Sequence, residues 1–147
     1  MTLQEILSKK GSNVHSIGPD ATLEDVVQTL VRHNVGSLIV CEHSGGDSPG
    51  RMVGIISERD ILRAVAGHRG PLTTQKVEDT MTCNVVTAPP SASVEDVMGL
   101  LTERRIRHLP VVDDGRLVGM ISIGDVVKAQ HDELSMENHY LRSYIQG

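Results

Sequence analysis

The sequence almost lacks aromatic side chains. It contains no Trp and no Phe, and its two Tyr, Tyr140 and Tyr144, lie close to the C-terminal end. A planar base bound by the body of the protein would therefore lie between aliphatic side chains and backbone instead of stacking on a ring. Binding of single-stranded nucleic acid on aromatic platforms is excluded for the same reason. The net charge of −5, with no basic run longer than residues 103–108, also excludes a broad cationic face for nucleic acid.

The sequence is also poor in cysteine and in long apolar runs. Cys41 and Cys83 have no metal or redox spacing, so we expect free thiols. Seven histidines occur without the spacing of a ligand set, and we predict no metal site and no required cofactor. No run reaches the ~18 apolar residues of a membrane span. Residues 1–12 carry lysines after their apolar residues, unlike a secretory signal, so we expect a cytoplasmic protein without membrane contact.

An internal repeat organises the chain. Residues 13–41 align without a gap with 84–112, and residues 51–62 ("RMVGIISERDIL") align with 116–127 ("RLVGMISIGDVV"). The first copy carries six extra residues within 42–50, a stretch rich in Gly, Ser, Asp and Pro that is typical of a surface loop.

The hydrophobic pattern changes in the same order within each copy. A short apolar segment, Val14–Ile17 or Val85–Ala88, precedes a stretch with helical spacing, then two β-rich runs and a second helix. The pattern predicts a mixed α/β fold (α+β with a mixed sheet), built from two β-α-β-β-α repeats related by a pseudo-twofold. We expect a short helix in the connector 73–82 and a tight hairpin turn at 113–116.

The Ser-x-x-Asp stretch that follows the second β-rich run in each copy has two interpretations. Ser57 with Asp60, and Ser122 with Asp125, fit the capping box that begins an ordinary helix. Each also follows a glycine-containing strand, so that backbone could approach a ligand, and a helix N-terminus with a hydroxyl group favours phosphate. Both interpretations can hold at once.

In its ordered, duplicated motifs the chain resembles a tandem pair of CBS domains, the regulatory domain first described in cystathionine β-synthase. The resemblance rests on "VGIISERDIL" and "VGMISIGDVV", on "RIRHLPVVDDGRLVG" at 105–119 and on "VEDTMT" at 77–82, and it covers about residues 1–130. It implies repeats at 8–68 and 76–131. The pattern of the residues that follow predicts a C-terminal helical tail at 132–147. It also implies a cleft between the repeats that binds an adenosine-containing ligand: AMP, ADP or ATP, or else S-adenosylmethionine or NAD.

The resemblance also implies which residues would contact the ligand. One site would combine Ser57, Arg59 and Asp60 with Arg107 and His108, and the other would combine Ser122 and Asp125 with Gly36 and Ser37. Val14, His15 and Thr87 would face the adenine edge. Pro110, which cannot donate to a β-ladder, indicates a sheet edge or a strand start, and either is compatible with a cleft wall. The second site offers no cation in this assignment, so we expect phosphate to favour the first.

The sequence shows no nucleophile–base pair and no Walker loop, so we predict a protein that is not an enzyme. The resemblance implies a regulatory module that acts as a homodimer and signals to an unknown client protein. A ligand-free interaction or structural protein remains the alternative, because both Ser-x-x-Asp stretches could be capping boxes alone. The tail could pack on its own domain, or it could contact a second copy or a partner.

Overall fold

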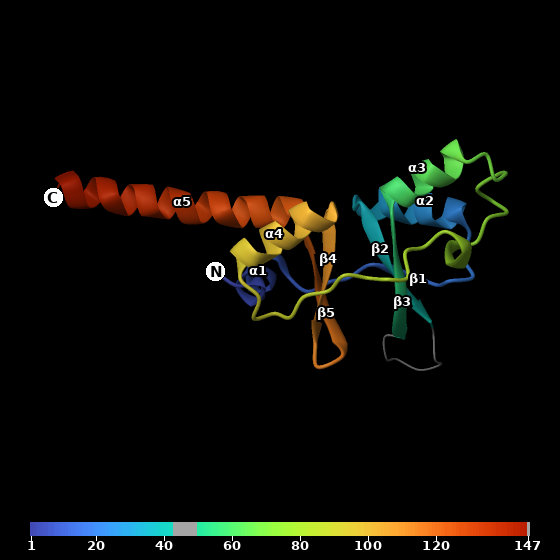
Figure 1. The fold of residues 1–147 in the computed structure, drawn as a ribbon, viewed down its shortest axis with the longest axis horizontal. Coiled ribbons are helices and arrows are strands. Elements are labelled where there is room, and N and C mark those ends of the chain that lie inside the picture. Colours follow the sequence, from blue (N-terminus) through green and yellow to red (C-terminus); the bar gives the residue numbers. More distant parts are fainter. Residues whose placement is uncertain (43–49, 147) are drawn as a thin grey trace. The chain divides into compact units, whose positions relative to one another are not determined.

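The structure, a computed structural model, describes residues 1–42 and 50–146. The loop predicted at 42–50 falls mainly on 43–49 and so lies outside the described residues. The helices and strands of the described residues are, in chain order, α1 (Leu3–Lys10), β1 (Ser16–Ile17), α2 (Leu23–His33), β2 (Ser37–Glu42), β3 (Arg51–Ser57), α3 (Glu58–Ala66), the short 3₁₀ helix η1 (Val77–Asp79), α4 (Val94–Arg104), β4 (His108–Asp113), β5 (Arg116–Ser122) and α5 (Ile123–Gln146). The predicted mixed α+β fold with two repeats is confirmed (Figure 1).

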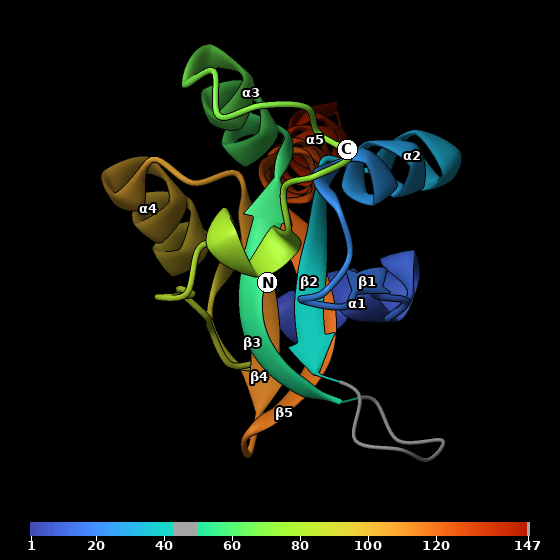
Figure 2. The same ribbon diagram turned by 90° about the vertical axis from the view of Figure 1, so that its right-hand side faces the viewer.

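Most of the first repeat, from β1 to α3, lies in one compact unit, Val14–Val85. Its sheet has the order β1-β2-β3, in which β1 is parallel to β2 and β2 is antiparallel to β3. Figure 2 shows β2 and β3 side by side, as their ladder requires. The core draws on α2, α3, both long strands and the connector: Leu23, Val26, Leu30, Leu38, Val40, Ile56, Ile61, Ala64 and Val77. The predicted short helix of the connector is η1, and it completes this core.

The other compact unit joins two distant segments, Met1–Asn13 and Val86–Gly147. Strands β4 and β5 form an antiparallel hairpin, and its predicted tight turn is confirmed by the positive φ of Asp114 and Gly115. The core of this unit contains apolar residues from α1, α4, α5 and the hairpin: Leu3, Ile6, Leu7, Ala88, Val94, Val97, Leu101, Leu109, Val111, Ile121, Val126 and Ala129. Helix α1 therefore packs with the second repeat, although in the sequence it lies at the N-terminal end, before β1.

The predicted strand at the start of the second repeat shrinks to a single bridge. In the first repeat, the N–H of Ile39 donates to the carbonyl of His15 and supports the ladder between β1 and β2. The residue aligned with Ile39 is Pro110, which has no N–H to donate. Only the isolated pair Ala88–Val111 remains of the corresponding ladder. Pro110 lies inside β4 and pairs with Met120 of β5, while on the other side of β4 the ladder is reduced to this bridge, as expected of a proline at the edge of a sheet.

The glycines of β3 and β5 accommodate the chain itself. A Cβ placed on Gly119 would lie 2.6 Å from Cδ2 of Leu7, and one on Gly54 would lie 2.8 Å from the carbonyl oxygen of Thr82. The sequence interpretation assigned this closeness to a ligand. The structure corrects it, because helix α1 approaches Gly119 and the connector approaches Gly54.

Helix α5 continues well past the second repeat (Figure 1). Residues 131–145 are exposed, and Glu133 among them lies 4.0 Å from the N-terminal amino group of the same unit. The exposed residues include six large apolar ones: Leu134, Met136, Tyr140, Leu141, Tyr144 and Ile145. Among residues 1–42 and 50–146, no helix is both long enough and apolar enough to cross a membrane.

Candidate functional site

The turn from β3 to α3 holds the first Ser-x-x-Asp stretch. Ser57 ends the strand, and its N–H and hydroxyl groups both donate to Oδ2 of Asp60, at 2.9 Å and 3.2 Å. The arrangement is a capping box at the start of α3, so the capping interpretation is confirmed. Both side chains are only half-buried, and each carboxylate oxygen can accept more than one hydrogen bond. A hydroxyl group of a ligand could therefore still bond to Asp60.

The start of β2 lies next to this turn. Ser37 pairs with Ser57 across the β2–β3 ladder, and the N–H of Glu58 donates to the carbonyl of Gly36 at 3.0 Å. Ser37 is buried. Gly36 and Ser37 are therefore neighbours of Ser57 in the same unit, and their predicted pairing with Asp125 stays a prediction.

The turn from β5 to α5 repeats this geometry. The N–H of Ser122 donates to Oδ2 of Asp125 at 2.8 Å, and the N–H of Asp125 donates to Oγ of Ser122 at 3.2 Å. His108 pairs with Ser122 across the β4–β5 ladder, and the N–H of Ile123 donates to the carbonyl of Arg107 at 2.8 Å. The structure thus brings Arg107 and His108 to the second turn. Their predicted pairing with Asp60 involves the other unit and stays a prediction.

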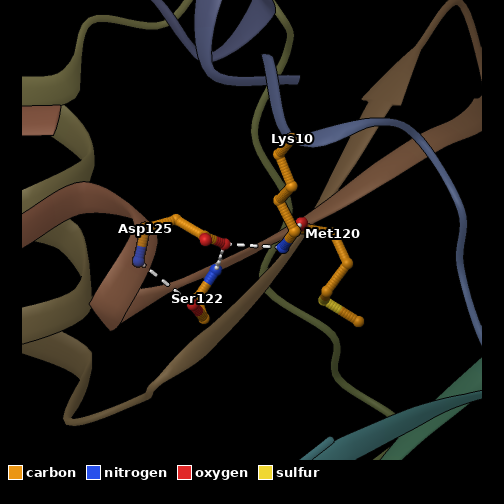
Figure 3. Close-up of polar contacts among 4 residues, drawn as sticks. All are labelled: Lys10, Met120, Ser122 and Asp125. Carbon is orange, nitrogen blue, oxygen red and sulfur yellow. Dashed lines mark hydrogen bonds and ion pairs between the residues drawn. The ribbon is translucent and has the colours of Figure 1, made fainter. Parts of the chain in front are cut away.

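A lysine that the sequence interpretation did not consider lies at the second turn. Nζ of Lys10, at the end of α1, donates to Oδ2 of Asp125 at 2.6 Å and to the carbonyl of Met120 at 2.8 Å (Figure 3). The expectation that this site lacks a cation is therefore wrong. The ion pair joins residues 115 positions apart in the sequence, and no local pattern indicated it.

The surroundings of Asp125 keep its carboxylate ionised. Burial raises its pKa, but the hydrogen bond from Lys10, hydrogen bonds from Ser122 and the charge of Lys10 act in the opposite direction and prevail. The net effect is a pKa below the ordinary value of an aspartate. Asp125 is thus an anionic acceptor at neutral pH with a cation beside it.

The remaining predicted site residues lie on the segments before the helices and strands. The carbonyl of His15 accepts a hydrogen bond from the N–H of Ile39 in β2. The imidazole ring of His15 stacks on that of His33, with the ring centroids 4.0 Å apart. Burial and the nearby His33 lower the pKa of His15. Val14 is half-buried, whereas Arg59 and Thr87 are exposed. In the part of the chain that the structure describes, no three His, Cys, Asp or Glu side chains form a cluster able to hold a metal ion.

Comparison with known proteins adds independent information. The family model of the CBS domain matches residues 3–67 and 77–132. The chain is 37% identical over 152 aligned positions to the mitochondrial CBS domain-containing protein CBSX3 of Arabidopsis thaliana, covering 99% of this chain and 72% of that protein. A crystal structure of a CBS-domain protein from Agrobacterium tumefaciens has a TM-score of 0.81 and 38% identity, covering 88% of this chain and 99% of that one.

A third similar protein was solved with a ligand. It is a CBS domain protein of Pyrobaculum aerophilum complexed with AMP, with a TM-score of 0.73 and 31% identity. The similarity covers 85% of this chain and 89% of that one.

Proposed function

Because the chain belongs to the CBS-domain family, we propose that it is a regulatory module that binds an adenosine-containing nucleotide of the AMP, ADP or ATP class and signals to a partner protein. The observation that carries the proposal is the same turn in both repeats: an aspartate held by the serine N–H at the start of a helix. The AMP complex of the similar archaeal protein supports the choice of ligand.

Each residue has a role in this proposal. Asp60 and Asp125 accept hydrogen bonds from ribose hydroxyls, since a carboxylate oxygen has acceptor capacity beyond its capping bond. Ser57 and Ser122 lie at helix N-termini, where backbone N–H groups and the helix dipole favour phosphate. The assigned basic residues for phosphate are Arg59, Arg107 and His108, and Val14, His15, Thr87, Ser37 and Pro110 complete the ligand contacts.

The test is titration calorimetry on nucleotide-stripped protein. We expect saturable AMP binding by the wild type. In Asp60→Asn the dissociation constant at the altered site should rise about tenfold or more, since the neutral amide is a poorer acceptor for ribose hydroxyls. Asp79→Asn is the matched control, because Asp79 is an exposed aspartate in the same unit. Loss of AMP binding in the control as well, or unchanged binding in Asp60→Asn, would contradict the assignment of Asp60.

A second candidate function is an interaction module that acts through its surfaces alone. An apolar groove of about 470 Å³ lies between α2 and α3, with Val31 and Leu62 at its exposed edges. The exposed apolar residues of α5 add a second such surface. The proposed homodimer would use one of these surfaces. Sedimentation measures the oligomeric state of the wild type and of a chain ending at residue 131, and loss of the dimer in the shortened chain would assign the contact to α5. If the protein acts only as an interaction module, no adenosine-containing ligand should change its stability.

A further inference from the structure

The second repeat satisfies one backbone carbonyl differently from the first. In the first repeat the carbonyl of Ile55 accepts a hydrogen bond from the backbone N–H of Thr82, at 2.9 Å. The residue aligned with Ile55 is Met120, and its carbonyl accepts the ammonium group of Lys10. A positive charge therefore lies in the second repeat where the first repeat has a neutral N–H group.

The ammonium group of Lys10 is held in place with bonding capacity to spare. It donates to Met120 and to Asp125, as Figure 3 shows, while an ammonium group has three donors. About a third of the Lys10 side chain is exposed, so solvent and solutes reach it. The third donor can therefore bond to an anion that arrives from solution.

The carboxylate beside Lys10 keeps an acceptor for the same ligand. The hydrogen bonds from Lys10 and from the N–H of Ser122 both reach Oδ2 of Asp125, so Oδ1 can accept a further donor. A cationic donor and an anionic acceptor held side by side match a solute that carries both a phosphate and hydroxyl groups. A nucleoside monophosphate has both, whereas an uncharged nucleoside has only the hydroxyl groups.

We propose that Lys10 binds the phosphate of a nucleotide held at the Ser122–Asp125 turn, so that the second repeat prefers AMP to adenosine. This inference rests on the proposed function and adds a specificity residue to it. It also removes the reason for expecting phosphate to favour the first site, because the second site does have a cation. Lys10 is the last residue of α1, which is not part of the second repeat in the sequence.

A purely structural role of Lys10 would affect AMP and adenosine binding differently from phosphate binding by Lys10. If Lys10 only ties α1 to β5 and orients Asp125, its loss weakens AMP and adenosine equally. If it binds phosphate, its loss lowers the preference for AMP and spares adenosine. The ratio of the two dissociation constants separates these roles even when a variant is somewhat less stable.

The experiment uses the Asp60→Ala protein, stripped of nucleotide, to silence the first turn. AMP and adenosine are titrated into it with Lys10 intact, with Lys10→Gln and with Lys10→Arg. Lys9→Gln is the matched control, because Lys9 is the neighbouring exposed lysine of α1. We expect Lys10→Gln to reduce the adenosine-to-AMP ratio of dissociation constants about tenfold, the effect of one charge-assisted hydrogen bond. Lys10→Arg should retain most of the ratio, and Lys9→Gln all of it.

Other outcomes overturn the inference. An unchanged ratio in Lys10→Gln, or an equal loss for both ligands, would make Lys10 a structural residue only. Binding by the wild type that disappears entirely in Asp60→Ala would show that the second turn takes no ligand, while the proposed function survives. No binding of AMP or adenosine by the wild type would overturn this inference, and no binding of ADP or ATP either would remove the proposed function itself.

Discussion

Gly119 and Leu7 should be energetically coupled, and this coupling tests the assignment of α1 to the core of the second repeat. A Cβ at Gly119 would lie 2.6 Å from Cδ2 and 2.9 Å from Cδ1 of Leu7, whose side chain is almost fully buried. Gly119→Ala alone therefore forces a buried leucine to move. Adding a group to a packed core costs about 1–3 kcal/mol.

The second substitution should relieve the first. Leu7→Ala alone removes a buried leucine side chain and should cost about 2–5 kcal/mol. In the double variant the methyl group added at position 119 enters the space that the leucine side chain vacated, so the strain term disappears. We expect the double variant to be more stable than the sum of the single effects predicts, by about 1–2 kcal/mol.

The assay is urea denaturation followed by circular dichroism, because the protein has no Trp. A matched control cycle combines Leu7→Ala with Gly54→Ala, since Gly54 is crowded by Met81 and Thr82 instead of α1. The control pair should be additive to within about 0.5 kcal/mol. Additivity in both cycles would refute the packing of Leu7 against Gly119.

Two further predictions concern pH. The folded-state pKa of Asp125 lies below its unfolded value, so the carboxylate stabilises the fold above the unfolded pKa of about 4, and this contribution is lost as the pH falls further. The stability gap between wild type and Asp125→Asn should thus be present at pH 7 and shrink below pH ~4, and a gap that does not change with pH contradicts this. The pKa of His15 is also lowered in the folded state, by burial and by His33, so the unfolded chain binds the proton more readily and stability falls as the pH drops through about 6.5. Between pH 8 and pH 5 the urea midpoint should fall less in His15→Gln than in the wild type. An equal fall in both proteins would assign the loss of stability to other groups.

The features that the sequence predicted well are those encoded locally. The helix starts and the hairpin turn depend on neighbouring residues. Thr22 and Asp25 each accept a hydrogen bond from the other's backbone N–H at the start of α2, and Asp114 and Gly115 adopt the turn that their residue types favour. The capping interpretation of Ser57 and Ser122 belongs to the same class. Each of these needs only a few consecutive residues.

The features that escaped prediction depend on contacts distant in sequence. Leu3, Ile6 and Leu7 have helical spacing, but nothing in them indicates that their partners are the strands of the second repeat. Lys10 reaches Asp125 only because α1 packs there, and so the second site was expected to lack a cation.

The shortened lead strand of the second repeat is a different case. Pro110 is aligned with a residue whose N–H supports the ladder of the first repeat. Because proline lacks that donor, a comparison of the two aligned residues would have predicted the loss.

Adenine-nucleotide binding is tested most directly by the melting temperature of nucleotide-stripped protein with AMP, ADP, ATP, NAD, S-adenosylmethionine or GTP. A ligand at 100 times its dissociation constant adds about 2.7 kcal/mol, which corresponds to several degrees for a chain of this length. We expect such a shift with at least one adenine nucleotide and none with GTP. A flat panel from folded, ligand-free protein would contradict it and leave Ser57 with Asp60, and Ser122 with Asp125, as capping boxes alone.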